Sequence, residues 1–127
     1  MCYNIGMAPN DLSYHSKVSS VMSQFSDWKR QTQMTRELYV SKHFVQRMVE
    51  RNMQNEAPFV FKMLTKVVWQ LRNTTFNQRT YKIVWKNLVV IAKISKQEIS
   101  NSDRYVVAKT LFYGDEFDPE YDEVIKL

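Results

Sequence analysis

The chain changes its hydrophobic period once, and this change limits the folds that are open to it. Between positions 16 and 71, apolar residues recur at steps of three and four, as in amphipathic helices, whereas between 80 and 113 they alternate or run on, as in strands. A group of helices followed by a group of strands is typical of the α+β class. We therefore predict an α+β fold with N-terminal helices packed on one face of an antiparallel β-sheet of three to four strands.

The first part of the chain predicts two or three helices before the strands of 80–113 begin. The first covers residues 16–31, and Ser13 or Ser16 is a candidate for its N-cap. The run 38–40 is expected to be extended, and Ser41 is then placed to cap the helix that follows it.

A further helix is predicted up to Leu71. Asn55 is a candidate N-cap, and Pro58 suits the first turn, where a missing N–H costs little. The strands that follow are expected over 80–85, 88–94 and 105–113. The first two are joined by a two-residue hairpin at Lys86-Asn87, and the last is closed by Gly114.

The bulk properties exclude several classes of protein. A length of 127 residues suits one domain, and no apolar run is long enough to cross a bilayer. Residues 10–20 are too polar for the core of a signal peptide, and Cys2, the single cysteine, has no internal disulfide partner. One cysteine and two histidines make a structural zinc site improbable. We expect a cytoplasmic protein with no metal, no other cofactor and no membrane partner.

The charge is distributed unevenly along the chain. Six of the thirteen acids lie after position 114, so that residues 1–114 carry 17 cations and 7 anions, a net charge of +10. A domain with this net charge usually binds a polyanion, and RNA or DNA is the first candidate. The alternative is a basic surface that is simply solvated. The acidic tail, residues 115–127, either docks through its apolar residues or folds back over the basic face. Those residues are Phe117, Tyr121, Val124 and Ile125.

The segment 41–51 contains the largest group of residues that could take part in catalysis. At helical spacing its apolar residues form one stripe, and its polar residues His43, Arg47, Glu50 and Arg51 fall on another face. A histidine one turn from an arginine combines a group that titrates near neutral pH with a permanent cation, and phosphate chemistry uses both. A solvated surface helix is the alternative.

Three motifs occur in an order that resembles a known family. They are Ser41-x-His43-x-x-x-Arg47-Met48-x-x-Arg51, a strand whose single charge is Lys93, and Val106-Val107-Ala108-Lys109-Thr110-Leu111-Phe112. Together they resemble the barnase, EndoU, colicin and RelE (BECR) superfamily of small ribonucleases, and its toxin-like members in particular. The resemblance divides a single domain, residues 1–127, into an N-terminal helical extension (1–37), a ribonuclease-like core (38–114) and an acidic tail (115–127).

The resemblance implies the catalytic residues His43, Arg47, Lys93 and Thr110. RNA supplies its own nucleophile, the 2′-hydroxyl, so such a site needs a proton carrier and cations but no metal. His43 would carry the proton, Arg47 and Lys93 would hold the phosphate oxygens, and Thr110 would donate to the same phosphate. Glu50 is expected to pair with Arg47 or Arg51.

RNA binding is assigned to further basic residues: Arg51, Lys82, Lys86, Arg79 and Lys109. Strand aromatics interleaved with these cations favour single-stranded RNA, because exposed rings stack unpaired bases. They are Tyr81, Trp85, Tyr105, Phe112 and Tyr113.

The function expected from the sequence is a metal-independent, toxin-like endoribonuclease that cleaves single-stranded RNA by 2′-hydroxyl attack. The alternatives are a non-catalytic module on the same fold that binds RNA or a host protein, and an interaction protein that uses the acidic tail as its contact. A cognate inhibitor or host protein is left open as a second partner beside RNA.

Overall fold

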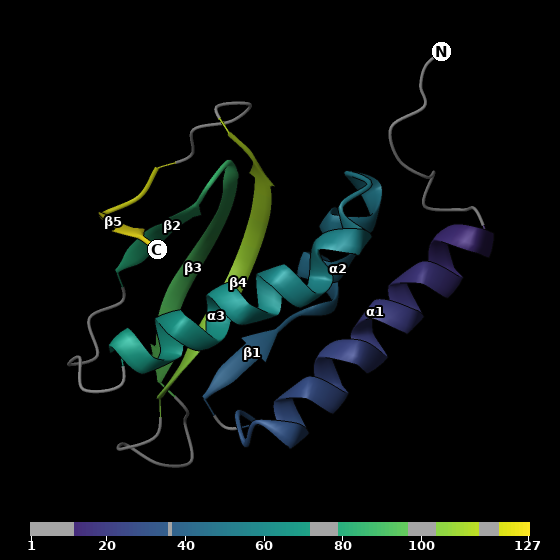
Figure 1. Cartoon of the computed structure of the whole chain (residues 1–127), viewed down its shortest axis with the longest axis horizontal. Coiled ribbons are helices and arrows are strands. Elements are labelled where there is room, and N and C mark those ends of the chain that lie inside the picture. The colour runs from purple at the N-terminus through teal and green to yellow at the C-terminus, as the bar shows by residue number, and fades with distance from the viewer. Residues whose placement is uncertain (1–11, 36, 72–78, 97–103, 115–119) are drawn as a thin grey trace.

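The computed structural model describes residues 12–35, 37–71, 79–96, 104–114 and 120–127 (Figure 1). Four helical and five strand elements follow one another in the order α1 (Leu12–Gln31), β1 (Leu38–Val40), α2 (Lys42–Glu50), the short 3₁₀ helix η1 (Gln54–Glu56), α3 (Ala57–Leu71), β2 (Thr80–Trp85), β3 (Leu88–Lys96), β4 (Arg104–Tyr113) and β5 (Glu123–Lys126). The predicted α+β class is confirmed.

The sheet differs from the prediction in size and direction. It has five strands in the order β1-β4-β3-β2-β5, and only the β2–β3 and β3–β4 pairs are antiparallel. The two outer strands, β1 and β5, pair in parallel with β4 and β2. β1 confirms the extended run expected over 38–40, whereas β5 was not predicted. The two strands have three and four residues, too few for alternation to show that they belong to the sheet.

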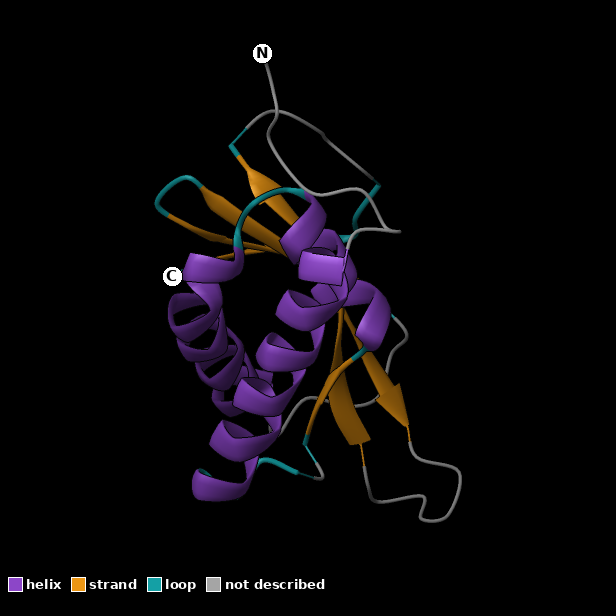
Figure 2. Cartoon of the chain, turned by 90° about the vertical axis from the view of Figure 1, so that its right-hand side faces the viewer, coloured by secondary structure: helices purple, strands orange, loops and turns teal. Residues whose placement is uncertain are grey.

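The helices gather on one side of the strands (Figure 2). α2 and α3 pack against β4, and α1 packs on α2 and α3 rather than on the sheet. The main core lies between these layers, and its residues on α2, Phe44, Val45, Met48 and Val49, are at most 1% exposed. Within the described ranges, no helix has both the length and the apolar character needed to cross a bilayer.

At the N-termini of the helices, two of the predicted N-caps are wrong and one is confirmed. α1 begins at Leu12, so Ser13 and Ser16 lie inside the helix and do not cap it. Asn55 lies in η1 rather than at the start of α3, although Pro58 is in the first turn of α3, as predicted. The Ser41 Oγ accepts a hydrogen bond of 3.0 Å from the Phe44 backbone N–H, which confirms Ser41 as the N-cap of α2.

The predicted two-residue hairpin is confirmed. Trp85 pairs with Leu88, and Lys86 takes a φ of +58°, a conformation that L-residues adopt at a cost. The Asn87 carbonyl accepts a hydrogen bond of 2.5 Å from the backbone N–H of Gly114, which ends β4 with a φ of +51°. The hairpin and the end of β4 therefore support each other at one corner of the sheet.

The end of the chain is docked on the sheet edge. β5 pairs with β2 from Tyr81–Glu123 to Val84–Lys126, and the Asp122 carboxylate accepts a hydrogen bond of 2.8 Å from the Thr80 N–H. Of the two arrangements expected for the acidic tail, residues 120–127 adopt the docked one. Main-chain pairing holds them there and Ile125 packs on the core, but Tyr121 and Val124, which were also expected to pack, are exposed. Phe117 lies outside the described residues.

Candidate functional site

The polar face of α2 carries most of the candidate site. Because the opposite face is buried, the side chains of His43, Arg47, Glu50 and Arg51 turn away from the core. His43 is exposed, and Arg47, Glu50 and Arg51 are half-buried. Seven residues make about two helical turns, so Glu50 projects within about 20° of His43. A histidine, two arginines and a carboxylate therefore share one side of this helix.

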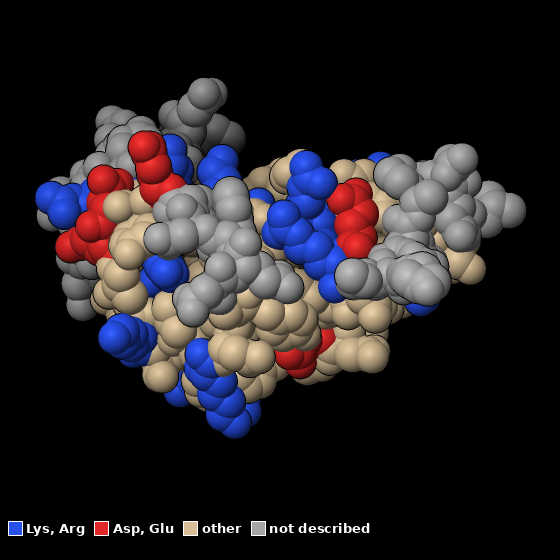
Figure 3. Space-filling view, turned by 90° about the horizontal axis from the view of Figure 1, so that it is seen from above, with Lys and Arg blue, Asp and Glu red and all other residues tan. Residues whose placement is uncertain are grey.

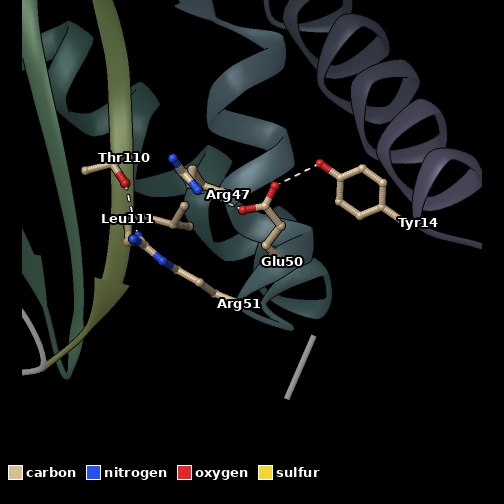
Figure 4. Close-up of polar contacts among 6 residues, drawn as sticks. All are labelled: Tyr14, Arg47, Glu50, Arg51, Thr110 and Leu111. Carbon is tan, nitrogen blue, oxygen red and sulfur yellow. Dashed lines mark hydrogen bonds and ion pairs between the residues drawn. The ribbon is translucent and has the colours of Figure 1, made fainter. Parts of the chain in front are cut away.

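Arg47 is held by Glu50, and Glu50 is held by α1 (Figure 4). Arg47 Nη1 lies 2.8 Å from Glu50 Oε1, and the Tyr14 hydroxyl donates a hydrogen bond of 3.0 Å to Glu50 Oε2. The predicted pairing of Glu50 with an arginine is confirmed. Burial raises the pKa of Tyr14, and its hydrogen bond to Glu50 raises that pKa further. Tyr14 therefore stays a hydrogen-bond donor, and the carboxylate that it orients fixes one side of the Arg47 guanidinium.

Arg51 reaches the sheet at a break in its pairing. Its Nη1 donates to Thr110 Oγ1 at 3.1 Å and also to the Leu111 carbonyl (Figure 4). The register shifts here, because Ile91 pairs with Thr110 while Ala92 pairs with Ala108, which leaves Lys109 as the extra residue of a β-bulge.

The bulge coincides with the point where β4 becomes an edge strand. β1 pairs with β4 only as far as Ala108, so the residues of β4 that follow have no strand on that side among the described residues. An edge strand presents unpaired carbonyl and N–H groups, and Arg51 satisfies one of these carbonyls, that of Leu111. Arg51 therefore acts as a clamp between the end of α2 and the open edge of β4.

Lys93 lies on the face of the sheet that points away from the helices. Side chains alternate along a strand, and Val90 and Ala92 belong to the main core while Ile91 belongs to a separate small cluster with Val89 and Phe112. Lys93 follows Ala92 and therefore shares the outer face with Ile91. Thr110 pairs with Ile91, which makes Lys93 a diagonal neighbour of Thr110 across the β3–β4 pair.

The structure brings the four residues implied as catalytic together only in part. Thr110 is joined to α2 by Arg51 and shares the outer face of the sheet with Lys93 of the inner strand β3, whereas His43 and Arg47 lie on α2, which packs on the other face. His43 is exposed rather than buried against α3, which leaves its imidazole accessible to solvent.

The residues assigned to RNA binding are spread more widely. Lys109 is exposed at the bulge, and Lys86 is exposed in the hairpin turn. Arg79 lies 3.5 Å from Glu123, and the Lys82 Nζ lies 5.0 Å from the centre of the Tyr121 ring, so both contact the C-terminal segment. On the face seen from above, basic side chains form separate groups, with acidic ones beside some of them (Figure 3).

Most of the strand aromatics are occupied by packing. Tyr81 is 3% and Phe112 1% exposed, and Trp85 packs on Phe59 with ring centres 4.4 Å apart. The Tyr113 hydroxyl donates to Glu56 at 3.1 Å. The described aromatic residues that are most exposed were missed by the sequence reasoning, and they are Tyr39, Trp69 and Tyr121. The run Leu38–Val40 is too short for its pattern to show that Tyr39 is exposed.

In the part of the chain that the structure describes, no three His, Cys, Asp or Glu side chains lie together as metal ligands would. Comparison of the chain with protein-family models, with characterised proteins and with solved structures gives no match.

Proposed function

We propose that this chain is a metal-independent endoribonuclease that cleaves single-stranded RNA by attack of the ribose 2′-hydroxyl. The observation that supports the proposal is the arrangement of α2 at the edge of β4. An exposed His43 shares a face with Arg47, and the next arginine on that face, Arg51, is bonded to Thr110.

The chemistry assigned to these groups is a transesterification. His43 takes the proton of the 2′-hydroxyl, the 2′-oxygen bonds to phosphorus, and the bond from phosphorus to the 5′-oxygen breaks. The leaving 5′-oxygen takes a proton from solvent water, and His43 returns its proton to solvent, which leaves a 2′,3′-cyclic phosphate and a 5′-hydroxyl. Arg47 uses one side of its guanidinium on Glu50 and offers its remaining N–H groups to the phosphate oxygens. Lys93 and Thr110 would add charge and a hydroxyl donor from the outer face.

A second function has its own support. Both arginines have structural partners, Glu50 for Arg47 and β4 for Arg51, as they would in a module that binds RNA without cutting it. Lys109 on the bulge and the Tyr121–Lys82 pair on the outer side of β2 would then contact the phosphates and bases.

One experiment separates the two functions. Purified protein is incubated with a fluorescently labelled single-stranded RNA of mixed sequence in excess EDTA, and products are followed by electrophoresis and mass spectrometry. Fragments that end in a 2′,3′-cyclic phosphate, formed by the native chain and lost with His43→Ala, are expected. RNA that stays intact at high protein concentration while still bound would refute the nuclease and support the binding module.

A further inference from the structure

A groove on the helical side of the molecule lies apart from the α2 site. It has a volume of about 490 Å³ and runs between the C-terminal end of α1 and α3. Its principal lining residues are Trp28, Met34, Pro58, Phe61, Lys62 and Trp69. None of these residues belongs to the proposed ribonuclease site, so the groove needs an explanation of its own.

The shape of the groove follows from one stripe of α3. Pro58, Phe61, Lys62, Thr65 and Trp69 all line it, and their spacings of three and four place them on one side of the helix. The eleven steps from the first to the last cover about 16 Å at the usual helical rise, which is about three turns. The groove is therefore long enough for a short helix lying along α3.

The floor of the groove is already packed. The ring of Trp28 lies 5.5 Å from Phe61 and 5.7 Å from Phe25, centre to centre, so it is held in place from two sides. At the far end of the stripe, Trp69 is 61% exposed. A preformed apolar floor with a large exposed aromatic residue beside it is typical of protein interfaces, where tryptophan is often the energetic anchor.

The charged side chain that lines the groove is positive. It is Lys62, and α3 contains no acidic residue. Lys29 and Arg30 lie in the last turn of α1, next to the lining residues Trp28 and Gln31, while Glu37 donates its backbone N–H to the carbonyl of the lining residue Met34. The one acid in α1, Asp27, is paired with Arg30. Partial burial lowers the pKa of Lys29, so a carboxylate placed beside it would stabilise its charged form. Apolar side chains and carboxylates are thus the complementary chemistry.

We propose that this groove binds an amphipathic helix of an acidic partner protein. About three turns of that helix would lay their apolar side chains on Trp28, Phe61 and Trp69, and glutamates or aspartates on its flanks would face Lys62 and Lys29. Binding at this groove does not depend on the ribonuclease proposal, because the two sites share no residue.

Two synthetic helices test the proposal. Both have about 16 residues with leucine at helical spacing of three and four on one face and no tryptophan. One carries glutamate on its flanks, and the other carries lysine in the same positions. Binding is followed through the intrinsic tryptophan fluorescence of the full chain, since Trp28 and Trp69 line the groove.

The glutamate peptide is expected to bind and shift the emission to shorter wavelength, and the lysine peptide is expected to bind far more weakly. Trp69→Ala should weaken binding by roughly tenfold or more, as loss of an aromatic anchor does. Lys62→Glu should abolish the preference for the glutamate peptide. Lys126→Glu is the matched control: this exposed lysine lies on β5 opposite Val84, on the outer face of the sheet, and its replacement should leave peptide binding unchanged. Trp69 and Lys62 are both exposed, so neither substitution should unfold the chain. Thermal melting of each variant checks that it is folded.

Three results would overturn the proposal. The first is equal binding of the two peptides, or binding of neither. The second is self-association of the native chain that Trp69→Ala removes, which would assign the groove to a second copy. The third is displacement of the glutamate peptide by a single-stranded RNA, which would assign it to nucleic acid.

Discussion

Tyr14 and Glu50 are joined by a hydrogen bond of 3.0 Å across a separation of 36 residues. Tyr14 is 2% exposed, whereas Glu50 lies at the margin of the polar face of α2, where it also pairs with Arg47. The ribonuclease proposal gives no residue of α1 a role. This contact supplies one, because α1 orients the carboxylate that fixes the arginine.

Replacing Tyr14 with phenylalanine should change how stability depends on pH. The pKa of Tyr14 is raised in the folded protein from its usual 10.0, so above pH 10 the folded chain holds this proton longer than the unfolded chain does. The stability linked to this group is fully present below about pH 10 and is lost as pH rises through the folded pKa. The native chain should therefore exceed Tyr14→Phe in stability by about 1 kcal/mol near neutrality, and this advantage should shrink at higher pH.

Urea denaturation of both chains, from about pH 8 to about pH 11, measures that difference. All other side chains are the same in both chains, so their contributions cancel in the difference. A difference that stays constant across this range would show that Tyr14 does not titrate differently in the folded state.

Under the ribonuclease proposal, His43→Ala should lower the cleavage rate by about 10² to 10⁴-fold while RNA affinity changes little. The side chain is exposed, so its loss should leave the melting temperature nearly unchanged. His15, exposed on α1, is the matched control, and His15→Ala should cleave at the native rate. Single-turnover cleavage separates rate from affinity. An unchanged rate for His43→Ala would remove this residue from the mechanism.

Thr110→Val should show whether the Thr110 hydroxyl serves only the contact with Arg51 or also the cleavage reaction. Valine keeps the shape of threonine but removes the hydroxyl that accepts from Arg51, so the free energy of unfolding should fall by about 1 kcal/mol. Thr110→Ser keeps the hydroxyl and should retain most of that contact. If Thr110 serves only the clamp, cleavage should be equal in all three chains once each is folded. A rate that drops with valine and is restored by serine would support a hydroxyl that donates to the phosphate.

Under either proposed function, the affinity for RNA should fall steeply with salt. Each phosphate contact releases condensed counterions, and for single strands the logarithmic slope is roughly −0.7 per contact. Lys109→Ala removes an exposed cation at the bulge and should make the slope shallower by roughly 0.7 if this lysine contacts a phosphate. Fluorescence anisotropy at several salt concentrations gives both slopes. Lys17→Ala, on α1, is the comparison variant, and an equal change for both lysines would argue against a defined contact at the bulge.

Deleting residues 120–127 should destabilise the protein. β5 covers the edge of β2, and the deletion removes its main-chain pairing, the Asp122–Thr80 contact and the Arg79–Glu123 ion pair. An exposed, unpaired β2 edge would also promote edge-to-edge association between molecules. We expect a lower melting temperature and more aggregation. An unchanged melting temperature together with tighter RNA binding would indicate instead that the tail shields a basic face.

Local patterns in the sequence were enough to predict the local features of this fold. The steps of three and four in α1 and α3, the alternation in β2 and the hairpin at Lys86-Asn87 all appear in the structure. Ser41 caps α2, and Glu50 pairs with Arg47, because each of these interactions spans only three residues. Within such a short stretch, the geometry of the element itself brings the partners together.

The tertiary structure alone decided the contacts that make up the candidate site. Tyr14 meets Glu50, and Arg51 meets Thr110, across 36 and 59 residues. The bulge at Lys109 and the parallel pairing of β1 with β4 depend on how distant strands meet. Hydrophobic period tells which face of an element is buried, but it holds no information on which other element covers that face or in what register. The sequence by itself therefore determined the elements and the polar face of α2, and packing decided which side chains that face contacts.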